Sequence, residues 1–465
     1  MTSLAQCLLD AGKFVGGADV AEEFVTQEIL KRLNIKIDVG FAHELPYEID
    51  CVIYTAAHFG PDNALVKQAH KKGIATYSHA QALGELFNDK DGIAVCGVGG
   101  KSTVSAMITW ILAKTSSSVL RPPSFSVGVG DINGLGKTGQ WRKDSQYFVA
   151  EADEYVTDPM AVAKGEEITP RFSYLNPKIT ICTNLEFDHP DVYRDFAHTK
   201  EIFKKFFQQL KVGGSLIINA DDPELKSLSQ ELKDEAQIYT FGKNKGADAQ
   251  LLAYQVTKQQ AECKFIINAN SSTNKQTFTM KLNLPGKFNC LNALAAILAT
   301  QAAGVPVATS IQALASFQST KRRFEFIGKK NNVLYYDDYA HHPAEISAMI
   351  EAMQTWLPNK RLFFAFQPHT YSRTKQLLPA FAQALAQAKR VILLDIFASA
   401  RETDDPSISS DILLQACKQE NPYLKIKKMK NIKGLARFCK MSLKSGDVLI
   451  TLGAGDIYKV HQLIK

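Results

Sequence analysis

At 465 residues the chain is too long for a single hydrophobic core, so two or three domains are expected. Hydrophobic residues make up 45% of the sequence and charged residues 22%, a balance typical of globular proteins rather than disordered ones. The net charge of +7 is spread along the chain, which favours anionic small substrates and gives no indication of nucleic acid binding.

Eight cysteines are scattered along the sequence without a C-x-x-C pair. Several lie in apolar runs, so they are expected to be small buried side chains in a reducing compartment. The sequence has neither a signal peptide nor an apolar run long enough to cross a bilayer, which predicts a cytoplasmic protein without membrane contact. The densest basic stretch, residues 425–430, lacks interleaved aromatic residues and is expected to be a solvated surface.

Residues 1–88 are predicted to alternate short strands with helices, as half of a doubly wound nucleotide-type fold. A helix is expected over residues 4–9, and strands are expected over residues 13–17 and 51–54. Asp19 follows the first of these strands. There it could bind a ribose or a base, or it could cap a turn, and the sequence favours neither alternative.

A glycine turn at residues 97–103 follows an apolar run and precedes a helical stripe of apolar residues. A strand, a glycine turn and a helix N-terminus together favour phosphate, because backbone N–H groups and the helix dipole attract anions. Lys101 adds a full charge, and a hydroxyl of Ser102 or Thr103 could bind Mg²⁺. Val95 occupies the place of the first glycine in the G-x-x-x-x-G-K-[ST] pattern, so an ordinary helix-opening turn is the alternative. The residues expected at the phosphate are Gly97, Val98, Gly99, Gly100, Lys101, Ser102 and Thr103.

Acidic residues follow the three strands that are predicted next along the chain. Ligands of open α/β sheets bind at the carboxyl ends of strands, so these residues should converge on the glycine turn. Mg²⁺ prefers oxygen ligands, which makes Glu151 the expected carboxylate, with Glu154 as its substitute. His189 could bind a second metal. By itself the Asp188–His189 pair is more often a hydrogen-bonded pair at a strand end, but its predicted position facing the turn favours a functional role.

Residues 250–284 are predicted to form an antiparallel hairpin on the central domain, and a domain boundary is expected near residue 320. Arg322 and Arg323 at this boundary could reach a γ-phosphate, because a guanidinium matches phosphate oxygens; the alternative is a surface pair. Beyond the boundary, strands and helices alternate again. The adjacent residues His341 and His342 should face opposite ways, so that one caps a helix while the other binds ligand.

Six motifs, in this order, resemble the Mur ligase family, and the resemblance extends from about residue 1 to residue 465. The motifs are residues 97–103, 151–154, 184–189 with Asp191, 286–292, 322–325 and 337–343. The resemblance implies an α/β protein of three domains. Residues 1–88 would form a Rossmann-like domain for a UDP-sugar. Residues 89–320 would form a P-loop-type ATPase domain with a mainly parallel sheet and an antiparallel hairpin, and residues 321–465 a Rossmann-like domain for the amino acid.

Residues 337–343 and 366–374 are most similar to the branch of the family that joins L-alanine to the lactyl carboxylate of UDP-N-acetylmuramate. This resemblance implies an ATP-dependent ligase of peptidoglycan precursor synthesis, working through an acyl phosphate with ATP and Mg²⁺, as a monomer or homodimer. Residues 151–155 and 184–189 are also similar to the branch that attaches a murein tripeptide, so that amine donor stays open. A third hypothesis is a catalytically inactive nucleotide-binding partner.

The resemblance implies a role for each residue that matches a motif. The catalytic group is Lys101, His189, Arg323, His342 and Arg373. The metal group is Ser102, Glu151 and His189. Beyond the glycine turn, the nucleotide group is Asn289 or Asn292 at the adenine, Arg323 at the γ-phosphate and Asp338 at the ribose. The substrate group is Asp19, His369 and Arg373.

The sequence departs from the family pattern at three places. The first strand of the family and its Gly-rich turn, which faces the UDP diphosphate, should precede Thr2. Val98 and Gly99 stand where related ligases usually have threonine and a larger polar residue. Lys200 is near the position at which some relatives carry a carbamylated lysine, but it is not expected to carry this group.

Overall fold

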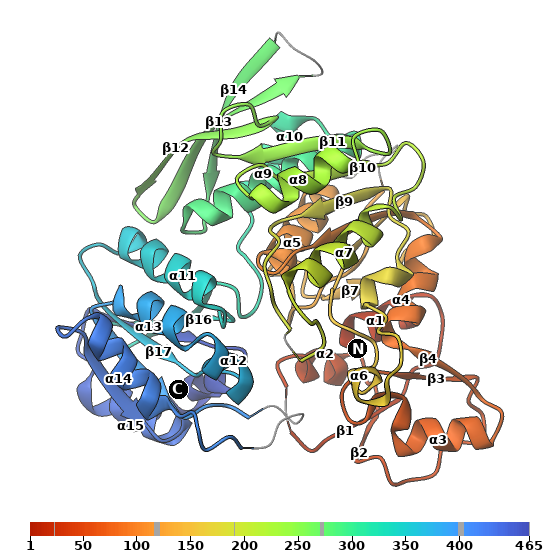
Figure 1. The fold of residues 1–465 in the computed structure, drawn as a ribbon, viewed down its shortest axis with the longest axis horizontal. Helices are drawn as coiled ribbons and strands as arrows, with labels where there is room; N and C mark the ends of the chain where they lie inside the picture. Colours follow the sequence, from red (N-terminus) through yellow and green to blue (C-terminus); the bar gives the residue numbers. More distant parts are fainter. Residues whose placement is uncertain (23, 116–120, 190, 270–273, 399–403, 465) are drawn as a thin grey trace. The chain divides into compact units, whose positions relative to one another are not determined.

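The computed structural model describes the chain except residues 23, 116–120, 190, 270–273, 399–403 and 465. The described residues form two compact units (Figure 1). The first unit contains residues 1–254, 263–282 and 290–318. The second contains residues 255–262, 283–289 and 319–465. The first unit thus joins the two regions that the sequence analysis separated after residue 88. No helix among the described residues has both the length and the apolar character needed to span a membrane.

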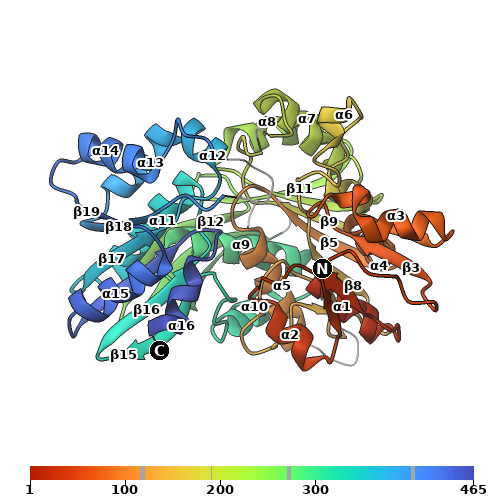
Figure 2. The same cartoon turned by 90° about the horizontal axis from the view of Figure 1, so that it is seen from below.

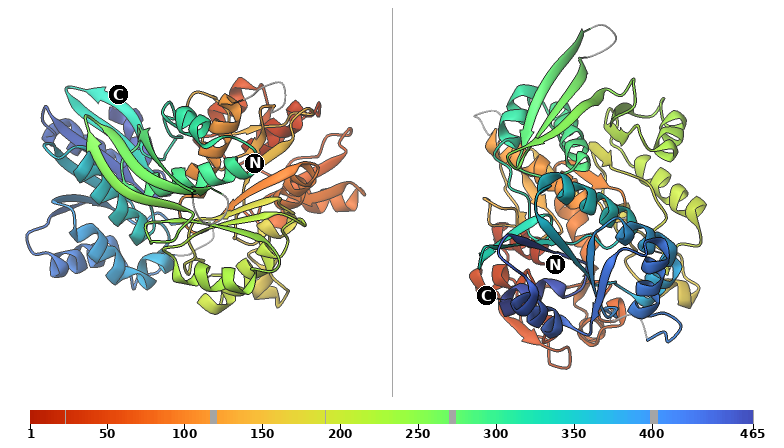
Figure 3. Two further views of the ribbon diagram at one scale, coloured as in Figure 1. Left: turned by 90° about the horizontal axis from the view of Figure 1, so that it is seen from above. Right: turned by 90° about the vertical axis from the view of Figure 1, so that its left-hand side faces the viewer.

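A ten-stranded sheet dominates the first unit, in the order β14-β13-β12-β11-β10-β9-β5-β8-β6-β7. The strands are β5 Asp91–Cys96, β6 Ser124–Ser126, β7 Gly139–Gln140, β8 Tyr147–Glu151, β9 Ile179–Cys182, β10 Ser215–Asn219, β11 Gln237–Gly242, β12 Ala249–Thr257, β13 Gln260–Ala269 and β14 Asn274–Leu282. From β12 through β11 to β6, the neighbouring strands run parallel, and β7 is antiparallel to β6. β13 and β14, coloured green, form a long hairpin that projects from the body of the sheet (Figure 3).

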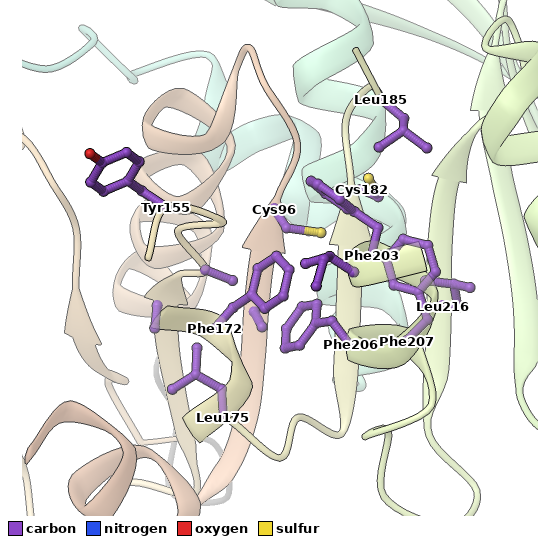
Figure 4. Packing of buried hydrophobic residues seen from close by; sticks show 14 of the residues in the cluster. Cys96, Tyr155, Phe172, Leu175, Cys182, Leu185, Phe203, Phe206, Phe207 and Leu216 are labelled. Carbon is purple, nitrogen blue, oxygen red and sulfur yellow. The ribbon is translucent and has the colours of Figure 1, made fainter. Parts of the chain in front are cut away.

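Helices cover both faces of this sheet, with α5 on one side and α7 and α8 on the other (Figure 2). This arrangement explains why β5 is apolar and buried after its first residue, Asp91, since a strand buried on both faces has no polar alternation. Below Cys96 and Cys182, aromatic side chains of Phe172, Phe203 and Phe206 fill one side of the core (Figure 4). The rings of Phe172 and Phe206 are stacked with centroids 4.3 Å apart. These side chains pack against the last residues of β5 and β9, so the core holds the carboxyl ends of both strands in place.

The α-helices of the described residues follow one another along the chain. They are α1 Thr2–Asp10, α2 Gln27–Arg32, α3 Ala64–Lys71, α4 His79–Asn88, α5 Lys101–Lys114, α6 Ala161–Lys164, α7 Phe196–Phe207, α8 Pro223–Glu231, α9 Lys287–Ala302, α10 Val307–Leu314, α11 Pro343–Trp356, α12 Tyr371–Gln376, α13 Leu378–Ala386, α14 Ser410–Glu420, α15 Ile432–Ser442 and α16 Val460–Ile464.

Helix α1 packs on the edge of the large sheet rather than on the strands that follow it. The side-chain oxygen of Gln6 accepts hydrogen bonds from the N–H groups of Thr138, at 3.0 Å, and Gly139, at 2.7 Å. A Cβ atom on Gly139 would lie 2.1 Å from the carbonyl oxygen of Ser3. This close approach, which only glycine permits, places the first residues of the chain within the first unit.

The N-terminal region differs from the prediction in its strands. Two separate parallel pairs replace the expected half of a doubly wound sheet: β1 Gly17–Asp19 with β2 Ile37–Val39, and β3 Cys51–Tyr54 with β4 Ala75–Ser78. The first strand was predicted over residues 13–17 and instead begins at Gly17. Phe14, the large apolar residue of the predicted strand, is fully exposed. The strand begins only where Gly17 finds its partner Ile37, because pairing rather than local propensity sets its position.

The second unit contains a six-stranded sheet in the order β15-β16-β20-β17-β18-β19. Its strands are β15 Glu325–Lys330, β16 Val333–Asp338, β17 Arg361–Phe366, β18 Arg390–Leu394, β19 Lys425–Met429 and β20 Asp447–Leu452. β15 is antiparallel to β16, and the remaining neighbours are parallel. A core of apolar residues from β16, β17, β18 and β20 packs against α15 and α16.

Strand β19 corrects the prediction that residues 425–430 are only a solvated surface. Ile426 is buried, whereas Lys425 and Lys427 on either side of it are exposed. Lys428 lies 3.1 Å from a carboxylate oxygen of Asp395. Lysines are common on edge strands, where their charge opposes pairing with another chain. The lysine-rich composition therefore concealed a strand at the edge of the sheet.

The cysteines also differ from the prediction. Cys263 of β13 and Cys290 of α9 form a disulfide, so the eight cysteines are not all reduced side chains. The remaining six are free, and of these only Cys51 is not buried. Burial of the six agrees with the prediction that they act as small apolar residues.

Candidate nucleotide and metal site

The glycine turn joins the end of β5 to the start of α5, as the sequence predicts. Gly97 and Gly100 have positive φ angles of 116° and 87°. A Cβ on Gly97 would lie 2.3 Å from Oγ1 of Thr183, and one on Gly100 would lie 2.9 Å from Oδ1 of Asn292. The turn therefore needs glycine at both positions, for conformation and for space. The N–H of Gly99 donates to Oδ1 of Asn184 at 2.9 Å.

Lys101 begins helix α5 and is held by Glu154. Its Nζ donates to both carboxylate oxygens of Glu154, at 3.0 and 2.9 Å, and to the carbonyl oxygen of Gly97 at 2.6 Å. Burial by itself would lower the pKa of Lys101, but the carboxylates of Glu154, Asp153 and Glu151 together outweigh burial and raise the pKa. The lysine is thus a fixed positive charge beside the turn. The sequence analysis named Glu154 only as a substitute ligand and missed this pairing.

Ser102 and Glu151 form the second element of the site. The hydroxyl of Ser102 donates to Oε1 of Glu151 at 2.7 Å. Oε2 of Glu151 accepts a hydrogen bond from the N–H of Gly128, where a Cβ would lie 2.6 Å from this oxygen. A hydroxyl and a carboxylate side by side are the oxygen donors that Mg²⁺ prefers. Thr103, the other hydroxyl of the turn, is buried.

His189 forms the third element, in the loop that follows β9. Its Nε2 lies 3.6 Å from Oε1 of Glu154 and 3.6 Å from Oδ2 of Asp188. One ligand atom from each of Glu154, Asp188 and His189 lies within 4.8 Å of the other two, so the three could hold one cation. Burial disfavours the imidazolium, but the carboxylates of Glu154, Asp188 and Asp153 together outweigh burial and raise the pKa of His189.

The predicted metal group, Ser102, Glu151 and His189, is therefore divided in the structure. Ser102 pairs with Glu151, whereas His189 lies with Glu154 and Asp188. Glu154 contacts both Lys101 and His189 and is only 3% exposed at its side chain. It is the residue that connects the phosphate turn to the histidine loop.

Asn289 and Asn292 are both buried on the first turns of α9. Asn292 belongs to the first unit and faces Gly100 of the glycine turn. Asn289 is grouped with the second unit, and its Nδ2 donates to the carbonyl oxygen of Pro285 at 2.7 Å. The two residues thus have different surroundings, and an adenine contact by either one stays a prediction.

Asp19 lies at the end of β1, and its Oδ1 accepts a hydrogen bond from the N–H of Val20 at 2.8 Å. A cavity of about 240 Å³ lies elsewhere in the first unit, at the ends of β3 and β4, and Asp19 does not line it. The lining residues are Met1, Tyr54, Thr55, Ala56, Ser78, His79, Ala80, Thr157 and Arg171. The sequence analysis missed this cavity, because Arg171 comes from a segment distant in sequence from the N-terminal strands.

In the second unit, Arg322 and Arg323 have different surroundings. The Nε of Arg322 donates to Oδ2 of Asp337 at 3.0 Å, and its Nη atoms donate to the carbonyl oxygens of Gly455 and Gly453. Arg323 Nη1 lies 3.7 Å from Oε1 of Glu345. The pair is therefore not a surface pair: Arg322 binds its own sheet edge, and the predicted γ-phosphate role applies to Arg323 alone.

Asp338 lies at the end of β16 and accepts hydrogen bonds from the N–H groups of Phe324, at 2.7 Å, and Ala340, at 2.8 Å. Burial raises the pKa of Asp338 to about 6, against the opposing effects of Arg323 and of these hydrogen bonds. Asp338 thus organises two backbone segments of the second unit, the one before β15 and the one after β16. Its predicted contact with a ribose is not tested by these bonds.

The remaining predicted residues follow strands of the second unit. His342 is the N-cap residue of α11, and Glu345 accepts hydrogen bonds from the N–H groups of His341 and His342. The rings of His341 and His369 have centroids 6.4 Å apart, which brings two of the histidine segments together. Arg373 lies in α12, the helix that follows His369 in the chain. Their roles toward substrate stay predictions.

Three domain models of one protein family match consecutive stretches of the chain. The Mur ligase middle domain matches residues 95–300, the Mur ligase glutamate ligase domain matches residues 322–455, and the Mur ligase family catalytic domain matches residues 1–91. The UDP-N-acetylmuramate–L-alanine ligase of Desulfitobacterium hafniense (strain Y51) is 34% identical over 99% of this chain and 96% of its own length. That of Clostridium novyi (strain NT) is 35% identical over 100% and 94%.

Two solved structures have a similar fold. UDP-N-acetylmuramate-alanine ligase from Thermotoga maritima has a TM-score of 0.79 at 23% identity, over 100% of this chain and 95% of that chain. A murein peptide ligase from Psychrobacter arcticus 273-4 has a TM-score of 0.70 at 23% identity, with the same coverage. These structural similarities confirm the predicted α/β class, and the matched family domains with the relatives of 34–35% identity confirm the predicted family. The chain belongs to the Mur ligase family.

Proposed function

We propose that the chain is an ATP-dependent amide ligase that joins L-alanine to the lactyl carboxylate of UDP-N-acetylmuramate through an acyl phosphate. The observation that carries this proposal is that Glu154 contacts both Lys101 and His189 beside the glycine turn, while Ser102 of the same turn bonds to Glu151. The choice of L-alanine rests on relatives named UDP-N-acetylmuramate–L-alanine ligase, which are 34–35% identical over almost the whole chain.

The site suits the transfer of a γ-phosphoryl group from ATP to a carboxylate. Catalysis of such a transfer depends mostly on positioning and on charge stabilisation. The N–H groups of the turn and the Lys101 ammonium would bind the β- and γ-phosphates. Glu154 keeps that ammonium beside Gly97, so the positive charge is in place before phosphate arrives. Arg323 is the proposed contact for the γ-phosphate from the second unit.

The residues present fit divalent cations. Ser102 with Glu151 offers two oxygen donors, and Glu154, Asp188 and His189 offer a mixed set within reach of one ion. When bound, Mg²⁺ neutralises the charge that develops on the transferred phosphoryl group. The buried position of Glu154 keeps its carboxylate oriented for this purpose.

The amine of the amino acid then attacks the acyl carbon, and phosphate leaves. We place His342, His369 and Arg373 at this second step, on the strand-end loops of the second unit. The cavity lined by Thr55, Thr157 and Arg171 is the proposed site for part of the UDP-sugar, because a guanidinium and hydroxyls suit phosphate and sugar oxygens. Water must be kept from the acyl phosphate throughout.

Phosphate release tests the proposal directly. Purified full-length protein is mixed with ATP, Mg²⁺, UDP-N-acetylmuramate and L-alanine, and each component is omitted in turn. Phosphate release is expected only in the complete mixture, with the amide product detected by mass spectrometry. No release in the complete mixture, with ATP still bound, would favour the inactive nucleotide-binding partner. Replacing L-alanine with L-alanyl-γ-D-glutamyl-diaminopimelate distinguishes the tripeptide branch, since faster release with the tripeptide would reassign the amine donor.

A further inference from the structure

Tyr155 lies beside the candidate cation site, and no predicted role includes it. Its ring is 5% exposed and belongs to the aromatic core below β5 and β9. The ring meets the imidazole of His189 edge-on, with centroids 4.8 Å apart and an interplanar angle of 60°. Tyr155 follows Glu154 directly in the sequence. It therefore contacts one member of the candidate cation group and is covalently joined to another.

The tyrosine is itself held in place from several sides. Its hydroxyl donates to Oδ2 of Asp191 at 2.7 Å. Its N–H donates to Oδ1 of Asp153 at 3.1 Å, and its carbonyl oxygen accepts from the N–H of Arg171 at 2.9 Å. The guanidinium of Arg171 lies over the ring at 5.3 Å from the centroid. A ring with this many contacts keeps one orientation and can restrict the movement of a neighbouring side chain.

His189 needs such support, because its backbone adopts a left-handed conformation with φ of 63°. A residue with a side chain rarely adopts this conformation unless its surroundings impose it. Oδ1 of Asp188 accepts the N–H of His189 at 2.9 Å, and the carbonyl oxygen of His189 accepts two N–H groups further along the loop. The hydroxyl of Tyr193 bonds to the carbonyl oxygen of Glu154. The histidine loop is thus tied to the segment that carries Glu154 and Tyr155.

We propose that Tyr155 is a positioning residue that fixes the imidazole of His189 against the carboxylates of Glu154 and Asp188, and so preorganises a divalent-cation site. Its ring blocks rotation of the imidazole away from Glu154, and its hydroxyl anchors the same loop at Asp191. The proposal rests on the proposed function only in taking this group of residues as a cation site. Residues that orient metal ligands typically change metal affinity 10- to 100-fold when removed.

The experiment measures Mn²⁺ affinity, which does not require catalysis. Free Mn²⁺ is followed by electron paramagnetic resonance as it is titrated into the full-length protein with ADP present. Tyr155→Leu removes the ring and is expected to weaken Mn²⁺ binding about 10-fold. Tyr155→Phe keeps the ring and loses only the bond to Asp191, so it should restore binding to within about 3-fold of the natural protein.

Tyr147→Phe is the matched control. Tyr147 is a buried tyrosine at the opposite end of β8, and its hydroxyl donates to the carbonyl oxygen of Ala303 at 3.1 Å. It should lower thermal stability as much as Tyr155→Phe does, without changing Mn²⁺ affinity. If Tyr155→Leu does not fold, Asp191→Ala removes the acceptor of the Tyr155 hydroxyl from outside the core, and about 3-fold weaker binding is expected from it.

The outcomes separate this proposal from the proposed function. Unchanged Mn²⁺ affinity in a folded Tyr155→Leu protein overturns the positioning role, and so does natural protein that binds Mn²⁺ no better than His189→Ala. If Tyr155→Leu cannot be obtained, unchanged affinity in Asp191→Ala likewise overturns it. Mn²⁺ binding that responds to Tyr155→Leu, in a protein that releases no phosphate, supports the positioning role and contradicts the ligase.

Discussion

In both sheets charged residues follow the carboxyl ends of strands, but the partners of these residues differ between the two units. At the edge of the first-unit sheet, Lys101 pairs with a carboxylate that also faces His189, so charged side chains contact one another. At the edge of the second-unit sheet, Arg322 and Asp338 are bonded largely to backbone groups. A charged residue after a strand can therefore be part of a reactive cluster or can organise its own loop. The partners that saturate its donors and acceptors decide between the two.

The largest expected effect is at Lys101. Lys101→Met should lower phosphate release about 1000-fold, because it removes the positive charge beside the transferred group. It also leaves the buried carboxylate of Glu154 unpaired, which costs stability. The double variant with Glu154→Gln should regain stability but not activity. If Lys101→Met alone keeps more than about a tenth of the natural rate of phosphate release, Lys101 has a structural role, as Arg322 does, and not a catalytic one.

Arg322→Gln tests the opposite assignment in the second unit. It should lower the unfolding free energy of that unit by about 3 kcal/mol, because the buried carboxylate of Asp337 loses its charged partner. Trp356 can report this unit alone in a protein whose Trp110 and Trp141 are replaced by phenylalanine, since the chain has three tryptophans. Urea unfolding followed by Trp356 fluorescence provides the measurement.

Arg361→Gln is the matched control for Arg322→Gln. Arg361 pairs with Asp447 in the same sheet, but its side chain is 37% exposed. Asp447 itself is buried, but its carboxylate also accepts the N–H of Lys444 at 2.7 Å, so the loss of the partly exposed Arg361 should cost only about 1 kcal/mol. Equal losses from the two arginine variants would contradict the structural assignment of Arg322.

The disulfide distinguishes the units in a second way, since both of its cysteines belong to the first unit. The bond closes a loop with a sequence separation of 27 residues, and its reduction should lower the unfolding free energy of the first unit by about 3 kcal/mol. A Trp356→Phe protein reports this unit through its other two tryptophans. The Cys263→Ser, Cys290→Ser double variant should not respond to dithiothreitol. A response in the second unit instead would place the effect elsewhere.

The smallest expected effect concerns pH and the second unit. Burial raises the pKa of Asp338 to about 6 from 3.8, so the folded state holds a proton that the unfolded state has lost between these values. Stability of this unit should therefore fall by about 2 kcal/mol as pH rises from 4 to 6. Asp338→Asn, which keeps one carbonyl acceptor, should flatten this decline. A decline of the same size in the variant would assign it to another group.

The sequence alone determined the local elements with strong patterns. An apolar run, two glycines and a lysine predicted β5, the turn and the start of α5, because each of these signals acts within a few residues. The family order of six motifs likewise predicted three regions and the α/β class. The weaker signals of residues 13–17 and of the lysine-rich β19 misled, because pairing with another strand decided both.

Only the tertiary structure decided which side chain meets which. The sequence favoured Glu151 and made Glu154 only its substitute, yet Glu151 contacts Ser102 while Glu154 contacts both Lys101 and His189. Arg322 and Arg323 are adjacent, yet Arg322 donates to carbonyl groups after β20 whereas Arg323 lies beside Glu345. Cys263 and Cys290 meet although no spacing rule relates them. Local backbone conformation depends on neighbouring residues, whereas side-chain partners come from distant segments that only packing brings together.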